Sequence, residues 1–135
     1  MPTIFDKLNL KGLEEILVLN APDEFEKELK KLRDVQVFRN VAEVKKLAFA
    51  LAFVTQRAEL TRLSKLLATK AAGDALLWFA YPKGTSKKYT CDFNRDDGWE
   101  TLRKLGFDSV RQVAIDEDWS ALRFRRVEFI KRPAK

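Results

Sequence analysis

The stretch that decides the fold is Ala75-Leu76-Leu77-Trp78-Phe79-Ala80-Tyr81-Pro82-Lys83, an apolar and aromatic run between turn residues. Such a run predicts a buried β-strand. Pro82 ends the strand, because proline has no N–H to donate to a sheet ladder. We expect this strand at the centre of a sheet, between a strand at residues 47–54 and a C-terminal hairpin, with Lys83 at the rim.

Strand and helix patterns alternate on both sides of this run. Apolar blocks predict further strands at residues 15–20, 35–38, 47–54, 110–115 and 121–130. Helical spacing of apolar residues fills residues 22–32, 55–72 and 94–106. This alternation predicts a three-layer α/β sandwich with a mostly parallel, Rossmann-like sheet that ends in an antiparallel C-terminal β-hairpin.

Two segments leave room for a second interpretation. Residues 47–54 also fit one face of a single helix over 41–72, but Phe49 and Phe53 would make that helix apolar nearly all round, so we favour a buried strand. We expect Thr55 to cap the next helix and Gly73 to end it. In the last strand the alternation slips, which predicts a bulge near residues 125–126.

The composition is that of one α/β domain over residues 1–135, with a lead-in at 1–13 and a basic tail at 131–135. Hydrophobic residues make up 46% and charged residues 34%, as in ordinary folded domains. The longest apolar run is too short to cross a bilayer and no signal pattern precedes it, so we expect a cytoplasmic protein without membrane contact.

Several chemistries are excluded by what the sequence lacks. It has no histidine and one cysteine, Cys91, so an internal disulfide, a cysteine metal cluster and Ser-His catalysis are impossible. Neither of the Gly-rich phosphate-binding motifs, G-x-G-x-x-G and G-x-x-x-x-G-K-S/T, occurs in the sequence. Asp92, Asp96 and Asp97 surround a predicted helix start, where helix capping explains them better than a metal does. We therefore expect no metal and no cofactor.

A candidate site follows from the loops at the carboxyl ends of the predicted strands, where ligands bind in open α/β sheets. These loops offer amide, hydroxyl, cationic, carboxylate and indole groups. The candidate residues are Asn20, Thr55, Arg57, Lys83, Asp118, Trp119 and Ser120. They predict a site for a small anionic or nucleotide-like ligand, although each could also serve only as a cap, a turn residue or a packing group.

The net charge of +6 is concentrated near the C-terminus. Arg123, Arg125 and Arg126 in the last strand suggest a nucleic-acid interface as an alternative. We favour a solvated edge strand, because no aromatic residues interleave with these cations for bases to stack on. The same hairpin edge is where a weak homodimer would form.

Four segments carry a family resemblance: Leu-Asn-Ala-Pro at 19–22, Phe-Val-Thr-Gln-Arg-Ala-Glu-Leu at 53–60, Trp-Phe-Ala-Tyr-Pro-Lys at 78–83, and Asp-Glu-Asp-Trp-Ser-Ala-Leu-Arg-Phe at 116–124. In this order they resemble a family of small bacterial proteins that carry a domain of unknown function. The resemblance spans residues 13–130. It implies that residues 47–54 are a strand, and it brings no established activity.

More distantly, Gly73-Asp74-Ala75-Leu76-Leu77 and the closing hairpin are similar to the later half of the sheet in S-adenosylmethionine-dependent methyltransferases. The chain departs from that family at 20–22, where Asn-Ala-Pro replaces a Gly-rich loop. It departs again after Phe38, where Arg39 and Asn40 stand in place of the acidic residue that binds a ribose. The resemblance therefore implies a methyltransferase-like shape without the cofactor chemistry.

Three functional hypotheses follow. The main one is a non-catalytic binding or interaction domain with a ligand site at the rim of the sheet. The first alternative is a degenerate methyltransferase-like enzyme, and the second is a nucleic-acid-binding protein that uses the basic C-terminal strand. Whether the chain is an enzyme stays open, with the non-catalytic reading favoured.

Overall fold

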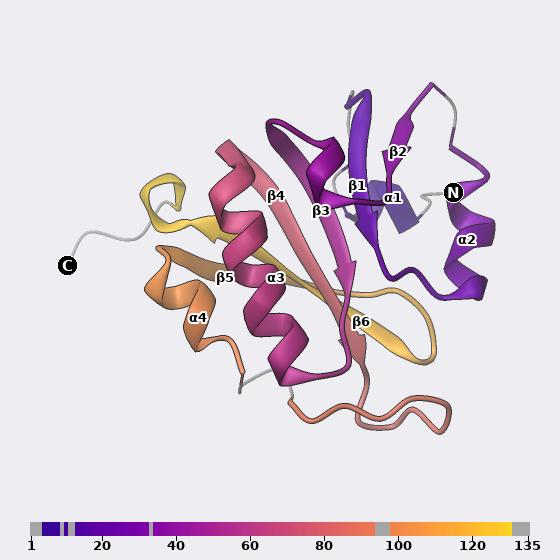
Figure 1. Ribbon diagram of the computed structural model, residues 1–135. Helices are drawn as coiled ribbons and strands as arrows, with labels where there is room; N and C mark the ends of the chain where they lie inside the picture. Colours follow the sequence, from indigo (N-terminus) through magenta and orange to yellow (C-terminus); the bar gives the residue numbers. More distant parts are fainter. Residues whose placement is uncertain (1–3, 9, 11–12, 33, 94–97, 131–135) are drawn as a thin grey trace.

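The computed structural model describes residues 4–8, 10, 13–32, 34–93 and 98–130, which fold as a single six-stranded sheet with helices on both faces (Figure 1). The strands are β1 (Glu15–Leu19), β2 (Gln36–Phe38), β3 (Leu47–Phe53), β4 (Ala71–Pro82), β5 (Phe107–Ala114) and β6 (Trp119–Arg126). The helices are α1 (Ile4–Lys7), α2 (Asp23–Leu29), α3 (Arg57–Lys70) and α4 (Glu100–Lys104), and the 3-10 turns are η1 (Val41–Glu43) and η2 (Val127–Phe129).

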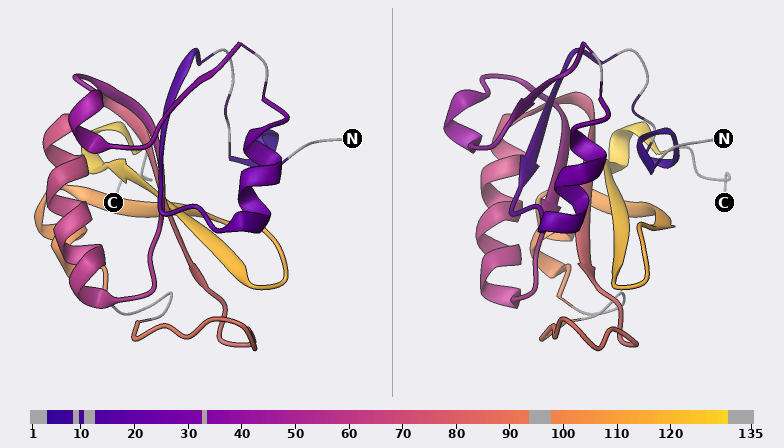
Figure 2. Two further views of the ribbon diagram at one scale, coloured as in Figure 1. Left: turned by 45° about the vertical axis from the view of Figure 1, so that its right-hand side comes forward. Right: turned by 90° about the vertical axis from the view of Figure 1, so that its right-hand side faces the viewer.

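The sheet order is β2-β1-β3-β4-β6-β5. Strands β2, β1, β3 and β4 run parallel, whereas β6 is antiparallel to both β4 and β5. Helices α3 and α4 pack on one face and α1 and α2 on the other, so the layers follow the predicted sandwich (Figure 2). The predicted fold class is therefore confirmed. No helix in the described part of the chain combines the length and apolar character needed to cross a bilayer.

Strand β4 lies at the centre, as the opening stretch predicts, between β3 and β6. Its side chains alternate between the two cores: Phe79 faces α3 and α4, and Trp78 faces α1 and α2. Both are fully buried. The indole Nε1 of Trp78 donates a hydrogen bond of 2.9 Å to the carbonyl of Leu8, which satisfies its only polar atom and fixes the chain after α1.

Strand β3 confirms the choice of a strand over a long helix at residues 47–54. Ala50 and Ala52 face α3, and their small side chains let that helix lie close to the sheet. Phe49, Leu51 and Phe53 fill the opposite core. Burial on both faces is the property of a central parallel strand.

Three local predictions are wrong. Thr55 does not cap α3, because Gln56 is the N-cap residue and forms no side-chain cap bond. Gly73 does not end α3, which stops at Lys70. It lies inside β4 with a φ of 53°, where β4 has extra residues relative to β3 and the chain needs the left-handed region.

The third wrong prediction is the bulge in the last strand, which the broken alternation of apolar residues suggested. No bulge is needed at residues 125–126, because β6 ends at Arg126 and the chain continues as η2. The bulge of the hairpin lies in β5 instead, between Ser109 and Arg111.

The importance of β3 can be measured by the substitution Leu51→Ala. Leu51 has no exposed surface, so its truncation should lower the free energy of unfolding by about 2–5 kcal/mol in urea denaturation. Leu66→Ala on α3 is the matched control, since Leu66 is 41% exposed, and it should cost well under half as much. Equal losses in the two variants would contradict the two-sided burial of β3.

Candidate functional site

The strand order reverses between β1 and β3, and this switch point holds a crevice beyond their carboxyl ends. From β1 the chain proceeds outward to β2, and from β3 it proceeds the other way to β4. Ligands of open α/β sheets bind at such a point. A cavity of about 510 Å³ occupies it; its lining residues are Asn20, Pro22, Asp23, Glu24, Phe53, Thr55, Glu59, Lys88, Tyr89 and Trp119.

Asn20 fixes the edge of this crevice. It adopts a left-handed φ of 59° directly after β1, a conformation that asparagine tolerates better than most residues. Its Nδ2 donates to the carbonyl of Phe53 at 3.2 Å, so its amide joins the ends of β1 and β3. Asn20 and Thr55, both predicted as site residues, therefore lie in the same crevice.

Three aromatic rings form one wall of the crevice. The ring centroid of Trp119 lies 5.0 Å from that of Phe53 and 4.8 Å from that of Tyr89. Trp119 is 3% exposed, and its buried Nε1 has no hydrogen-bond partner. Trp119 was predicted as a site residue, whereas Tyr89 was not, because it lies in a polar loop without strand or helix periodicity.

Carboxylates dominate the charge of the crevice. Asp23, Glu24 and Glu59 stand against one ammonium, that of Lys88, which lies 3.3 Å from a Glu24 oxygen. The Tyr89 hydroxyl donates to the same oxygen at 2.8 Å. This lining favours a cationic group over the anionic ligand that the sequence suggested.

The pKa values of this cluster shift in the directions expected for a hydrogen-bonded group. A backbone hydrogen bond, followed by the Tyr89 hydroxyl, lowers the pKa of Glu24. Burial and then the Glu24 hydrogen bond raise the pKa of Tyr89. The pair thus holds a carboxylate and a neutral phenol at neutral pH, and it fastens the segment 84–93 to the start of α2.

The remaining predicted residues do not join this crevice. Lys83 and Ser120 line a second cavity of about 600 Å³, which among the described residues has only Tyr89 in common with the crevice. Asp118 is used in a turn, where its carboxylate accepts from the Ser86 hydroxyl at 2.8 Å and its carbonyl accepts from the Lys83 N–H. Arg57 lies at the start of α3 and lines neither cavity.

Asp92 caps a helix, as the sequence suggested, but it caps α3 and not the helix that follows it in the chain. Its Oδ1 accepts from the backbone N–H of Arg57 at 2.5 Å, so it caps α3 from 35 residues away. Asp96 and Asp97 lie outside the described residues. Within the described ranges, no cluster of three or more metal-binding side chains occurs.

The three basic residues proposed for nucleic acid are largely committed to internal contacts. Arg125 forms a two-pronged ion pair with Asp74, at 2.7 and 2.6 Å. Arg126 donates to the carbonyl of Ala71 at 2.7 Å and lies over the ring of Phe107. Of the three, only Arg123 lacks such a partner within the described part of the chain. The structure therefore gives less support to a nucleic-acid interface than the sequence did.

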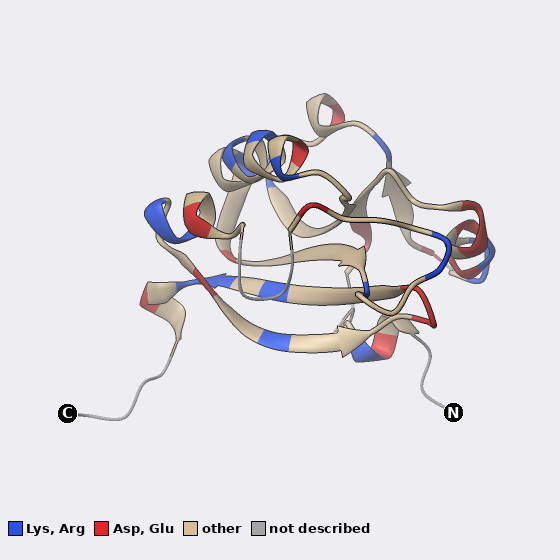
Figure 3. Ribbon diagram, turned by 90° about the horizontal axis from the view of Figure 1, so that it is seen from below, with Lys and Arg blue, Asp and Glu red and all other residues tan. Residues whose placement is uncertain are grey.

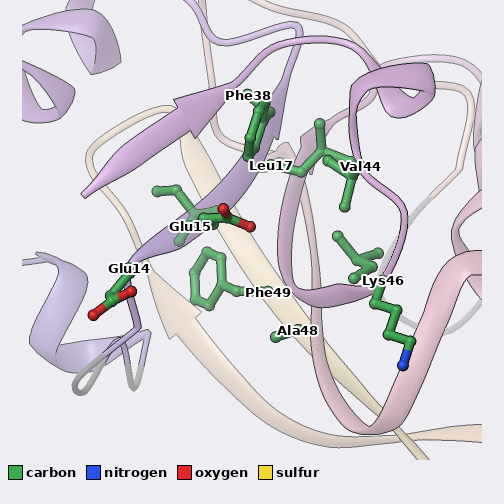
Figure 4. A pocket seen from close by; sticks show the side chains of 10 residues that line it. Glu14, Glu15, Leu17, Phe38, Val44, Lys46, Ala48 and Phe49 are labelled. Carbon is green, nitrogen blue, oxygen red and sulfur yellow. The ribbon is translucent and has the colours of Figure 1, made fainter.

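A further cavity, of about 430 Å³, lies at the opposite end of β1 and β3 (Figure 4). Phe38, Val44 and Phe49 line it, and the charged groups of Glu14, Glu15 and Lys46 lie around it. It faces the amino ends of the strands, whereas the crossover helices begin at the carboxyl ends. It is therefore a weaker candidate than the switch-point crevice.

The comparisons with known proteins find fold relatives only among solved structures. No protein-family model and no curated protein sequence matches the chain. An S-adenosylmethionine-dependent methyltransferase from Aquifex aeolicus matches with a TM-score of 0.59 and 15% identity, over 92% of this chain and 88% of that one. An N-methyltransferase from Bradyrhizobium japonicum, solved with S-adenosyl-L-homocysteine, matches with a TM-score of 0.55 and 10% identity, over 89% and 81%.

A third match, the fibrillarin pre-rRNA processing protein of Methanococcus jannaschii, has a TM-score of 0.55 and 13% identity over 86% of this chain and 67% of that one. At such identities the matches establish the fold: the chain has the Rossmann-like fold of methyltransferases. They also correct the main functional prediction. The expected non-catalytic binding domain is contradicted by the recurrence of methyltransferases among the matches, and the methyltransferase-like alternative is the better supported.

The contact between Glu24 and Tyr89 predicts a pH-dependent contribution to stability. Because folding lowers the pKa of Glu24 below its ordinary 4.5, the contribution is present above about pH 4.5 and is lost as the pH falls through the lower, folded value. Glu24→Gln should therefore lower the melting temperature at pH 7 and change it little at pH 3.

Thermal unfolding followed by tryptophan fluorescence measures this difference, since Trp119 contacts Tyr89. Glu28→Gln is the matched control, on the same helix but outside the crevice. A loss that is the same at both pH values would show that Glu24 acts through packing rather than through its charge.

Proposed function

We propose that the chain is a methyltransferase-like enzyme whose site is the crevice at the switch point of the sheet. The observation that carries this proposal is the lining of the crevice, where carboxylates and aromatic faces meet beyond β1 and β3. The similarity of the fold to that of methyltransferases supports the proposal. The finer resemblance, to small bacterial proteins of unknown function, stays a prediction.

The residues of the crevice fit the methionine half of S-adenosylmethionine. That half carries a sulfonium and an ammonium, so its cations outnumber its one carboxylate. The crevice offers three carboxylates: Glu24 contacts Lys88, Glu59 forms a long ion pair of 4.0 Å with Arg62, and Asp23 is not part of the Lys88 contact. The ring of Tyr89 carries the ammonium of Lys88 at 5.4 Å from its centroid, which is the kind of contact that a π-face offers to an onium group.

The fit does not extend to the nucleoside half. Rossmann-type folds bind a ribose through an acid that follows the second strand. Here Arg39 follows β2, and its two terminal guanidinium nitrogens donate to Glu26 of α2, at 2.5 and 2.7 Å. Pro22 also removes one backbone donor from the turn after β1. We therefore expect weak binding that is governed by the charged half.

Bound there, S-adenosylmethionine would supply an activated methyl group. The chain's own contribution is electrostatic and steric. Glu59 and Asp23 would hold the cationic groups, Thr55 would offer a hydroxyl near them, and Tyr89 would cover the site together with Trp119. Because the Tyr89 hydroxyl is bound to Glu24, the position of Tyr89 over the site depends on that hydrogen bond.

The proposal is tested by isothermal titration of the full chain with S-adenosylmethionine and with S-adenosylhomocysteine. The sulfonium compound should bind more tightly, because the homocysteine compound keeps the ammonium but lacks the sulfonium charge. Glu59→Gln should weaken binding of the sulfonium compound about threefold, which corresponds to ~0.7 kcal/mol for one exposed charge contact.

Glu28→Gln serves as the control, since it makes the same change of charge on α2 without touching the crevice. It should leave both affinities unchanged. The proposed function fails if neither compound binds at millimolar concentration, or if Glu59→Gln and Glu28→Gln have the same effect.

A further inference from the structure

Two arginines lie directly opposite each other on the hairpin, away from the crevice. Arg111 of β5 and Arg123 of β6 are register partners, and so are Val113 and Ala121 two residues further along. Val113 and Ala121 belong to the core on the α1 and α2 face, so both arginines point to that face as well. Figure 3 shows basic segments side by side on the two strands of the hairpin.

This pairing costs stability in the free protein. Directly opposed side chains of an antiparallel pair have Cβ atoms about 5 Å apart, and like charges at this spacing repel. Among the described residues, neither Arg111 nor Arg123 has an ion-pair or hydrogen-bond partner, whereas the neighbouring Arg125 is neutralised by Asp74.

Arg123 is moreover partly desolvated. Its Nε is buried and has no acceptor, which leaves a charged donor unsatisfied. Burial lowers the pKa of the Arg123 guanidinium, and the positive charges of Arg125 and Arg111 lower it further. The charge of Asp74 offsets part of this effect, but Asp74 forms its hydrogen bonds with Arg125, and the net shift of the Arg123 pKa stays downward.

The bulge in β5 is what creates the pair. Ser109 faces Phe124, so regular alternation would place Val110 opposite Arg123 and turn Arg111 to the other face. The register shift inserts Val110 as an extra residue and brings Arg111 onto the same face as Arg123. Bulges re-aim side chains in this way, often at sites of function.

We propose that Arg111 and Arg123 form a binding site for a phosphate group on the hairpin, where Arg111 is exposed and Arg123 is half-buried. Two guanidinium groups side by side offer parallel N–H donors that match the oxygens of a phosphate, and a doubly charged anion would cancel their repulsion. The phosphate can belong to a small phosphorylated molecule or to a nucleic-acid backbone. The site does not depend on the proposed function, since the crevice lies elsewhere and carries the opposite charge.

The test is a titration of the full chain with pyrophosphate at low ionic strength, by calorimetry and thermal shift. Pyrophosphate should bind and raise the melting temperature. Arg111→Gln and Arg123→Gln should each weaken binding about tenfold or more. Arg62→Gln is the control, because Arg62 lies on α3, over the opposite face, and should leave the affinity unchanged.

A second arm uses a single-stranded oligonucleotide to identify the source of the phosphate. Tighter binding than that of pyrophosphate, with a salt dependence that decreases in Arg111→Gln, would assign a nucleic-acid backbone. Binding of pyrophosphate alone would assign a small phosphorylated ligand.

Unfolding without ligand gives an independent readout. Arg111→Gln should raise the melting temperature at low salt, because it removes the repulsion, and should lose the stabilisation by pyrophosphate. The proposal is overturned if the wild-type chain binds neither probe, or if both glutamine variants bind pyrophosphate as the wild type does.

Discussion

The burial of β3 and β4 on both faces is the constraint on which the rest of the structure depends. Strands with apolar side chains on both sides need a layer of helices above and below, and parallel neighbours can be connected only by crossovers. Phe49 and Leu51 are buried under the layer formed by α1 and α2, and Leu77 and Phe79 are buried under α3 and α4. The sandwich and its switch point follow from this requirement.

The same constraint places the crevice. Because the crossovers from β1 and from β3 leave the sheet on opposite faces, the chain segments after the two strands diverge and leave a crevice between them, although the strand ends themselves stay paired. The segment 84–93 covers part of this crevice. Two carboxylates hold it there: Glu24 binds Tyr89, and Asp92 caps α3. The loop is thus ordered by long-range contacts rather than by its own sequence.

The two candidate sites are separate surfaces of opposite charge. The crevice collects carboxylates around aromatic rings, and the hairpin carries a pair of guanidinium groups. The methyltransferase-like fold is compatible with the first surface, although the turn after β1 and the end of β2 lack the groups that would hold a nucleoside. The arginine pair of the hairpin plays no part in the proposed methyltransferase-like function. An anion bound from solution would neutralise its two like charges.

The sequence by itself determined the fold class, the central place of β4 and the strand nature of residues 47–54, because two-sided apolar runs bounded by turn residues are a local pattern. It also brought Asn20, Thr55 and Trp119 to one rim, since the carboxyl ends of neighbouring strands meet. It could not show that Lys83 and Ser120 face another cavity, that Asp92 caps α3, or that Glu24 and Tyr89 join.

Those contacts were decided only by the tertiary structure, because they link residues 35 or more positions apart through a loop that has no periodicity of its own. The register of the hairpin is of the same kind. A bulge of one residue at Val110 changes which side chains face each other, and local sequence gives no sign of it. Pairing across space, not propensity along the chain, therefore set the charge of both candidate sites.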